Sequence, residues 1–170
     1  CEMTKEAGLP DGVFNFVTGG GSTAGQELVD NLDVDAVVFT GSKDVGMRLI
    51  HDNAGRAFPR PLVIEMGGKN PALVMASANL DKATDGVMRS AFGAQGQKCS
   101  ACSRVYVARE VRDAFVRLLV EKTKAIAIGN PLRRDVYLGP VINEDAVRIY
   151  ERAVAQARAD GGKILTGGRR

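Results

Sequence analysis

The sequence predicts an α/β fold built around mostly parallel sheets. Short β-branched or aromatic runs alternate along the chain with longer segments in which apolar residues recur every three or four positions. This alternation is typical of strand–helix–strand units, whose consecutive strands run parallel. A glycine-rich stretch at 19–25 also lies between an expected strand and an expected helix, an arrangement that aims backbone N–H groups at a phosphate.

Each element follows from its own local pattern. Strands are expected at 13–17, 34–39, 61–65, 72–75, 103–108 and 163–166. Helices are expected at 26–30, 43–50, 79 to about 93, 111–128 and 144–159. Ser42, Asn79 and Asn143 stand where N-terminal caps belong, just before three of these helices. Asn70 and Pro71 restrict the backbone, so this pair is a candidate crossing into a second domain.

The composition is that of an ordinary globular protein, and it excludes several function classes. Hydrophobic residues make up 45% and charged residues 25% of the 170 positions. The formal net charge of +3 comes from basic residues spread along the chain, so no nucleic-acid partner is expected. No apolar run approaches the roughly 18 residues of a membrane span, and no signal-peptide pattern opens the sequence, so no membrane partner is expected.

The cysteines bear on the cellular compartment. The chain has three cysteines: Cys1, Cys99 and Cys102. A count that is low and odd argues against a disulfide framework. Free thiols favour a reducing environment, so a cytoplasmic location is expected.

Cys99 and Glu65 are the two residues best placed for chemistry. Cys99 follows a polar, glycine-containing segment with Lys98 beside it, which favours exposure to a ligand over burial in a core. Glu65 ends an apolar run, and ligands bind at the carboxyl ends of strands in α/β folds. A thiol can attack an electrophilic carbon, and a carboxylate can activate water to release the product. A packing cysteine and a surface glutamate are the structural alternatives.

Cys99 and Cys102 also form a C-x-x-C pattern, which leaves other interpretations open. One is a thiol–disulfide switch, although this motif usually opens a helix and here precedes an expected strand. The other is half of a zinc site, for which the sequence has no second cysteine pair and only one histidine, the remote His51. No metal site is therefore expected.

The glycine stretch and Ser42 are each open to two interpretations. The spacing Gly19-x-Gly21-x-x-x-Gly25 is one residue longer than the common dinucleotide fingerprint, and a flexible turn accounts for it equally well. Ser42 is a helix cap, but its hydroxyl and the helix N-terminus could equally face a phosphate.

Four segments in this order resemble the aldehyde dehydrogenase superfamily: the glycines at 19–25, Phe39–Ser42 with Gly46, Glu65–Pro71, and Gly96–Cys99. Cys99 follows Glu65 by 34 positions, which fits that family's separation of nucleophile and general base. The resemblance covers essentially the whole chain. The run 96–104 most resembles 1-pyrroline-5-carboxylate dehydrogenases, also called glutamate semialdehyde dehydrogenases, enzymes of proline catabolism.

The resemblance implies NAD(P)-dependent oxidation of an aldehyde to a carboxylic acid, with L-glutamate 5-semialdehyde as the expected substrate. Cys99 would attack the aldehyde to give a thiohemiacetal, and hydride loss to the nicotinamide would leave a thioester. Glu65 would activate the water that hydrolyses this thioester. The backbone N–H of Cys99 would contribute to the oxyanion hole, and Ser100 would hydrogen-bond the substrate carboxylate.

The resemblance also implies the cofactor side of the site, with NAD as the expected cofactor and NADP as the alternative. Ser42 would lie near the pyrophosphate at the helix start, and Met66 and Gly67 would lie along the nicotinamide. The residues implied for cofactor binding are Gly21, Gly25, Gly41, Ser42, Gly46, Met66 and Gly67.

The resemblance further implies that the sequence is an internal fragment. Residues 1–68 match the later part of an NAD(P)-binding domain, and 69–170 match the first part of a catalytic domain. The family's oxyanion asparagine would lie outside the chain, so the isolated fragment is expected to be inactive and the full-length protein a homo-oligomer. The alternatives are another semialdehyde or broad-range aldehyde dehydrogenase and, from a different class, a non-catalytic binding or redox module that uses Cys99 and Cys102.

Overall fold

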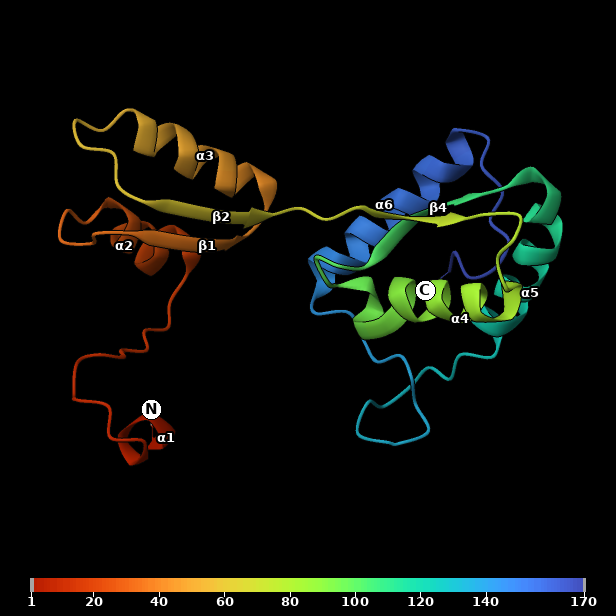
Figure 1. Cartoon of the computed structure of the whole chain (residues 1–170), viewed down its shortest axis with the longest axis horizontal. Coiled ribbons are helices and arrows are strands. Elements are labelled where there is room, and N and C mark those ends of the chain that lie inside the picture. The colour runs from red at the N-terminus through yellow and green to blue at the C-terminus, as the bar shows by residue number, and fades with distance from the viewer. Residues whose placement is uncertain (1, 170) are drawn as a thin grey trace. The chain divides into compact units, whose positions relative to one another are not determined.

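A computed structural model describes residues 2–169 (Figure 1). Cys1, which the sequence places at a helix end, and Arg170 lie outside the described residues. The chain divides into two compact units, the first ending at Gly67 and the second beginning at Gly68.

Unit 1 is organised around two parallel strands joined by a helix. Strand β1 (Val37–Gly41) pairs with β2 (Leu62–Met66), and α3 (Lys43–Ala54) connects them along one face of the pair (Figure 1). Helix α1 (Glu2–Glu6), a π-helical turn (Gly21–Gly25) and α2 (Gln26–Asp30) precede this pair. The predicted strand–helix–parallel-strand pattern is thus confirmed for this part of the chain.

Arg60 and Asn53 fix the return from α3 into β2. The Asn53 amide donates to the Arg60 carbonyl at 3.0 Å and accepts the Arg60 N–H at 3.2 Å. The Arg60 guanidinium donates to the carbonyls of Val29, Asn31 and Val34, which lie in the segment that leads into β1. Carbonyls at the end of α2 and in the irregular segment after it thereby gain a charged donor.

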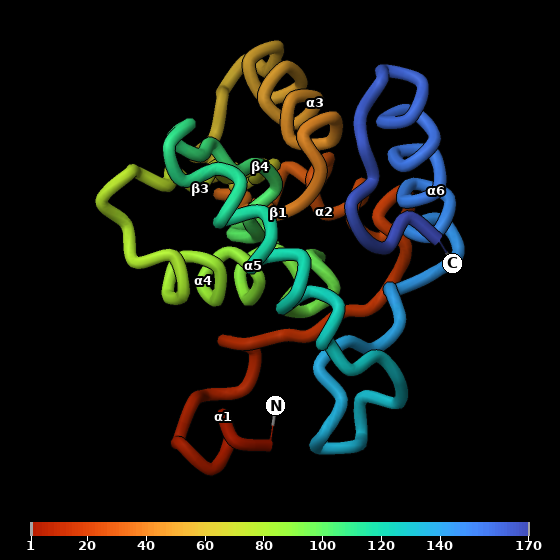
Figure 2. The backbone as a smooth tube through the Cα atoms, turned by 90° about the vertical axis from the view of Figure 1, so that its right-hand side faces the viewer, coloured from red at the N-terminus to blue at the C-terminus, as the bar shows by residue number. Residues whose placement is uncertain are grey.

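Unit 2 repeats the pattern with a better-packed core. Strands β3 (Asn70–Val74) and β4 (Cys102–Val107) are parallel, and α4 (Leu80–Phe92) and α5 (Arg112–Lys124) pack side by side against them (Figure 2). Short 3₁₀ turns at Gly93–Gly96 and Arg109–Val111 and the helix α6 (Glu144–Ala159) complete this unit. The core holds Val74, Val87 and Phe115, and the Phe115 side chain is only 1% exposed.

The cap predictions are confirmed. Ser42 accepts the Val45 N–H at 3.3 Å, Asn79 accepts the Lys82 N–H at 3.0 Å, and Asn143 accepts the Ala146 N–H at 3.0 Å. Each of these side chains satisfies an N–H group that the first helical turn leaves without a partner.

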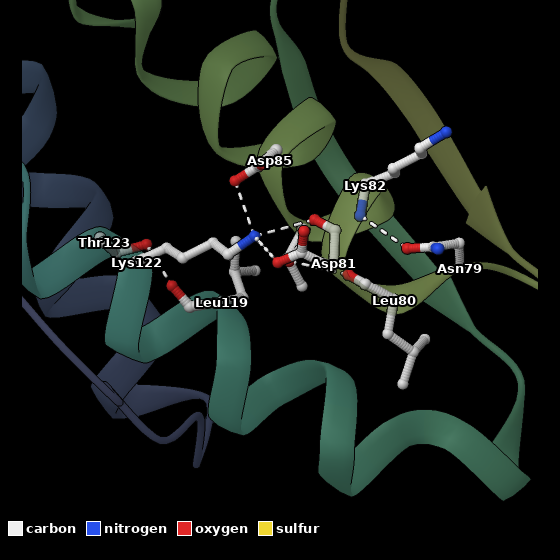
Figure 3. A network of polar contacts seen from close by, with 9 residues as sticks. Asn79, Leu80, Asp81, Lys82, Asp85, Leu119, Lys122 and Thr123 are labelled. Atoms are coloured by element: carbon white, nitrogen blue, oxygen red, sulfur yellow. Dashed lines mark hydrogen bonds and ion pairs between the residues drawn. The ribbon is translucent and has the colours of Figure 1, made fainter.

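Lys122 joins the two helices of unit 2 (Figure 3). Its ammonium, on α5, donates to the carboxylates of Asp81 and Asp85 on α4, each at 2.7 Å, and to the Asp81 carbonyl at 2.8 Å. The Lys122 side chain is 21% exposed. The hydrogen bonds that Lys122 donates to the two carboxylates raise its pKa above the usual 10.5.

Lys122→Met should lower the melting temperature at neutral pH, because it removes the ammonium while keeping the apolar stem. Since the folded pKa of Lys122 is raised, its contribution is fully present below about pH 10.5 and is lost as the pH rises through the folded pKa. The difference between wild type and variant should therefore shrink at strongly alkaline pH. Thermal melts followed by circular dichroism from pH 7 to 11 measure it, and a difference that stays constant over this range would contradict the assignment.

Two predicted strands do not form. Residues 13–17 are irregular, with Phe16 and Val17 about 70% exposed, and residues 163–166 are also irregular. A strand needs a neighbour to accept and donate its backbone hydrogen bonds. Within the described residues, the two sheets contain only β1 with β2 and β3 with β4, so neither segment is paired.

Several element boundaries differ from the predictions, among them the end of α3 at Ala54 rather than at 50. Strand β1 begins at Val37 rather than at 34, and its Val38 side chain is 78% exposed, although a strand of this apolar composition is expected to be buried. The glycine stretch is helical from Gly21 onwards, because the Gly25 N–H donates to the Gly20 carbonyl five residues back. Helix α5 ends at Lys124, four residues before the predicted end, and the Gly129 N–H, which a longer helix would pair with the Ala125 carbonyl, donates to the Leu138 carbonyl instead.

Within residues 2–169, no helix combines the length and the apolar character that crossing a membrane requires.

Candidate active-site segments

The loop that carries Cys99, residues 93–101, is held in a strained conformation. After α4 ends at Phe92, Ala94, Gln95 and Gly96 have φ angles of 51°, 58° and 71°. Two consecutive non-glycine residues in the left-handed region carry a conformational cost, and such conformations persist only where surrounding contacts enforce them. The loop then presents Cys99 as an exposed free thiol.

Contacts from several directions fix this loop, which we call the thiol loop. Ser90 on α4 accepts the Cys102 N–H at 3.2 Å. Gln97 accepts the Ile142 N–H at 3.0 Å through its side-chain oxygen. Gln95, in the amide orientation that satisfies both partners, accepts the Gly139 N–H at 2.9 Å. The thiol loop is therefore tied both to the end of α4 and to the segment before α6.

The chain entering β3 approaches the thiol loop from the other side. The Asn70 amide donates to the Cys99 carbonyl at 2.6 Å and lies 3.3 Å from the Ala101 carbonyl. Gly68 comes so close that an added Cβ would lie 2.6 Å from the Cys99 carbonyl oxygen. From the sequence, Asn70 is expected only to mark a domain crossing, since its contact with Cys99 leaves no local signal.

The two cysteines of the C-x-x-C pattern differ in environment. Cys102 is half-buried at the start of β4, and its thiol donates to the Arg104 carbonyl at 3.3 Å. Lys98 turns back toward Gly93, where its ammonium lies 3.5 Å from the position a Cβ would take. Among the described residues, no group of three or more His, Cys, Asp or Glu side chains is arranged to hold a metal ion.

The carboxyl edge of the unit 1 strand pair gathers four of the predicted residues. In the parallel register Thr40 lies opposite Glu65, and Gly41 lies opposite Met66. Ser42 follows directly and begins α3, while Glu65 is exposed. The 12-residue helix α3 begins at this edge, and Glu65 points to the opposite face of the strand pair from its neighbours Ile64 and Met66, whose side chains meet α3.

Gly46 allows α3 to pack closely on β2. An added Cβ would stand 2.6 Å from the Met66 sulfur and 2.9 Å from the Ile64 Cγ2. Gly46 is buried in this contact. The structure thus places Gly46 in helix–strand packing, which is one of the roles that glycines have in nucleotide-binding units.

The first turn of α3 is the part of this edge best suited to an anion. The first turn of α3 is exposed at Lys43 and Asp44, and the capping bond of Ser42 engages the Val45 N–H. The helix dipole and the unpaired N–H groups of a first turn favour an anion at that position, although Asp44 opposes it. Gly21 has open space around its Cα, and Gln26 on α2 accepts a hydrogen bond from Arg48 on α3 at 3.4 Å, so the glycine turn belongs to the same unit.

The structure thus brings Gly41, Ser42, Glu65 and Met66 together in unit 1, and holds Cys99 and Ser100 on one loop in unit 2. Glu65 and Cys99 belong to different units. That these two face a common cleft stays a prediction.

The chain was compared with known proteins. The model of the aldehyde dehydrogenase family matches residues 1–170. The chain is 40% identical to 1-pyrroline-5-carboxylate dehydrogenase of Anoxybacillus flavithermus over 98% of its length, and 40% identical to aldehyde dehydrogenase 1A1 of Oryctolagus cuniculus over 99%. A crystal structure of NAD-dependent aldehyde dehydrogenase from Sinorhizobium meliloti matches 99% of the chain, with a TM-score of 0.94 and 40% identity.

The chain spans about a third of these relatives: 33% of the first, 34% of the second and 33% of the solved structure. This coverage agrees with the expectation of a part of a longer protein. Because the family model matches from the first residue to the last, the chain belongs to the aldehyde dehydrogenase family.

Proposed function

We propose that this chain supplies the nucleophile and the general base of an NAD(P)-dependent aldehyde dehydrogenase. The observation that carries the proposal is the exposed Cys99 thiol on a strained, multiply anchored loop, in a chain of this family. Strain held in place by surrounding contacts is common where a reactive group must keep one orientation.

In the proposed mechanism Cys99, as the thiolate, adds to the aldehyde carbon and forms a C–S bond. The backbone N–H of Cys99 stabilises the oxyanion that develops, a contribution worth about 3–4 kcal/mol for one such donor. The nicotinamide cofactor, when bound, supplies the two-electron acceptor for the oxidation. Glu65 then takes a proton from the water that attacks the Cys99 thioester, and the carboxylic acid leaves as the thiol is restored.

On the cofactor side, Ser42 and the first turn of α3 bind the pyrophosphate. Gly21 and Gly25 lie on the neighbouring turn. Gly41 and Gly46 allow the chain to approach closely there. Met66 and Gly67 follow Glu65 directly and would lie along the nicotinamide. The Sinorhizobium meliloti protein is an NAD-dependent aldehyde dehydrogenase, which supports NAD as the cofactor.

Ser42→Asp separates cofactor binding from helix capping. Asp caps a helix about as well as Ser, so the melting temperature should stay within a few degrees of wild type. The added negative charge beside the pyrophosphate should raise the KM for NAD by about tenfold or more, since it repels the ligand. Ser42→Asn is the matched neutral control and should leave the KM within about threefold. Equal KM values for Asp and Asn would contradict the assignment.

For the substrate we propose L-glutamate 5-semialdehyde. The run 96–104 resembles the enzymes that act on it, the 1-pyrroline-5-carboxylate dehydrogenases. The Anoxybacillus flavithermus relative is such an enzyme by name. Ser100 is exposed next to Cys99, where its hydroxyl could hydrogen-bond the substrate carboxylate. A broad-range aldehyde dehydrogenase is the second candidate, because the rabbit protein is equally similar at 40% identity.

Steady-state kinetics of the full-length protein test the substrate. We expect kcat/KM to be at least tenfold higher for glutamate semialdehyde than for aliphatic aldehydes of similar length. Ser100→Ala should raise the KM for the semialdehyde about tenfold and leave the aliphatic aldehydes unchanged, because it removes a hydrogen bond to a charged group. A wild-type kcat/KM that is equal for glutamate semialdehyde and the aliphatic aldehydes would favour the broad-range enzyme.

The complete protein would act as a homo-oligomer in the cytoplasm, and the isolated 170-residue chain would not turn over substrate because it holds only part of the site. The redox alternative is tested by Cys102→Ser, which damages a thiol–disulfide module as much as Cys99→Ala does but leaves a dehydrogenase largely active.

A further inference from the structure

We propose that Asn70 is a positioning residue that orients Cys99, an inference that rests on the proposed role of Cys99 as nucleophile. Asn70 is the first residue of β3, and in the sheet register it lies opposite Cys102. Its side chain therefore reaches across the turn that connects Cys99 to β4.

The amide of Asn70 holds two carbonyls of the thiol loop at once. Nδ2 donates to the Cys99 carbonyl at 2.6 Å and to the Ala101 carbonyl at 3.3 Å. The Ala101 N–H in turn donates to the Lys98 carbonyl at 3.1 Å, which closes the turn that contains Cys99. One side chain thus fixes the turn from residue 99 to residue 101.

The position of Asn70 is itself fixed by the backbone before it. Gly68 and Lys69 have φ angles of 139° and 64°, and an added Cβ on Gly68 would meet the Cys99 carbonyl oxygen. The Arg104 guanidinium, on β4, donates to the Lys69 carbonyl at 2.7 Å. A left-handed non-glycine residue and a close backbone contact are sustained here by a charged hydrogen bond from the neighbouring strand.

This arrangement sets the direction of the groups around the thiol. A trans peptide is planar, so a Cys99 carbonyl held toward Asn70 directs the Ser100 N–H the opposite way. Asn70 also holds the oxygens of the Cys99 and Ala101 carbonyls toward itself. These oxygens therefore do not point at the reacting oxygen, where their partial negative charge would repel the negative charge that develops. Loss of Asn70 frees the peptide after Cys99 to rotate, so we expect an effect on kcat rather than on binding.

The test uses the full-length protein with three substitutions at residue 70. Asn70→Asp keeps the shape but replaces the donor with an acceptor, and should lower kcat about 100-fold, the loss that a misplaced reacting group produces. Asn70→Ala should lose about as much, and Asn70→Ser, which keeps one donor, should recover part of it. The KM for NAD and for the aldehyde should stay within about threefold.

Asn79→Ala is the matched control, since it also removes an Asn side chain that bonds backbone in unit 2. It should lower the melting temperature but leave kcat unchanged. A second readout is alkylation of Cys99 by iodoacetamide without cofactor, followed by mass spectrometry relative to Cys102. This rate ratio should change at least threefold in Asn70→Asp and not in Asn79→Ala.

The inference is overturned if Asn70→Asp keeps wild-type kcat and alkylation while Cys99→Ala is inactive, an outcome that leaves the proposed function intact. Retained turnover in Cys99→Ala overturns the proposed function itself. If the residue 70 variants do not fold, Arg104→Gln replaces them. Arg104 is exposed, so its substitution should leave folding intact, and the change removes the charged hydrogen bond to the Lys69 carbonyl. It should lower kcat about tenfold, and wild-type kcat in that variant would equally overturn the inference.

Discussion

Cys99→Ala should abolish aldehyde oxidation by the full-length protein, with a loss in kcat of about 10⁴-fold or more. Removal of a covalent nucleophile leaves only binding and electrostatic stabilisation, and losses of that size or larger follow when such a group is deleted. The measurement is the rate of NADH formation at saturating aldehyde and NAD.

Cys102→Ser is the matched control for this substitution. Cys102 is half-buried and donates its thiol proton to the Arg104 carbonyl, a bond that a serine hydroxyl can also form. We expect this variant to keep more than half of the wild-type kcat. Equal losses in the two cysteine variants would instead favour the thiol–disulfide module.

Glu65→Gln should stall the reaction after the first oxidation. The amide keeps the size of the side chain but cannot take a proton from water, so hydrolysis of the Cys99 thioester should slow by about 10²–10⁴-fold. Rapid-mixing measurements should show a burst of NADH close to one equivalent per site, followed by a slow steady state.

Added hydroxylamine sharpens this prediction, because it is a nucleophile that needs no general base. It should cleave the accumulated thioester and restore turnover in Glu65→Gln, while Cys99→Ala should remain inactive. Glu27→Gln, at an exposed glutamate of α2 in the same unit, should behave as wild type. A Glu65→Gln protein without a burst and with normal kcat would show that this carboxylate is not the base.

The parts of the fold that the sequence predicted are those encoded locally. Ser42, Asn79 and Asn143 begin their helices as expected, because a cap depends only on the N–H groups two or three residues ahead. The parallel pairing of strands also follows from the order of strands and helices, since each crossover helix returns the chain in the same direction.

The parts that the sequence did not predict depend on partners distant along the chain. Residues 13–17 have the composition of a strand but no neighbour to pair with among the described residues. Helix α5 stops at Lys124, and the backbone of residues 127–129 forms hydrogen bonds with residues 137 and 138 instead of continuing the helix. Helix propensities do not describe such bonds to a later segment.

The residues of the candidate site likewise divide into those that the sequence predicted and those that it did not. Cys99 and Glu65 were found from residue type and neighbouring glycines, and their roles follow from the resemblance to the family. Asn70 and Arg104 were not predicted, because the bond from Asn70 to Cys99 and the bond from Arg104 to Lys69 span 29 and 35 positions and leave no periodic signal. The left-handed conformations of Ala94 and Gln95 also have no signature, since neither residue type favours that region.

Gly68 has a practical consequence for anyone who wishes to redesign the enzyme. Because even a methyl group there would press on the oxygen of residue 99, libraries that vary this position should return almost nothing but the parental residue. Diversity aimed at new aldehydes is better introduced at Ser100, whose exposed side chain borders the nucleophile without supporting its backbone.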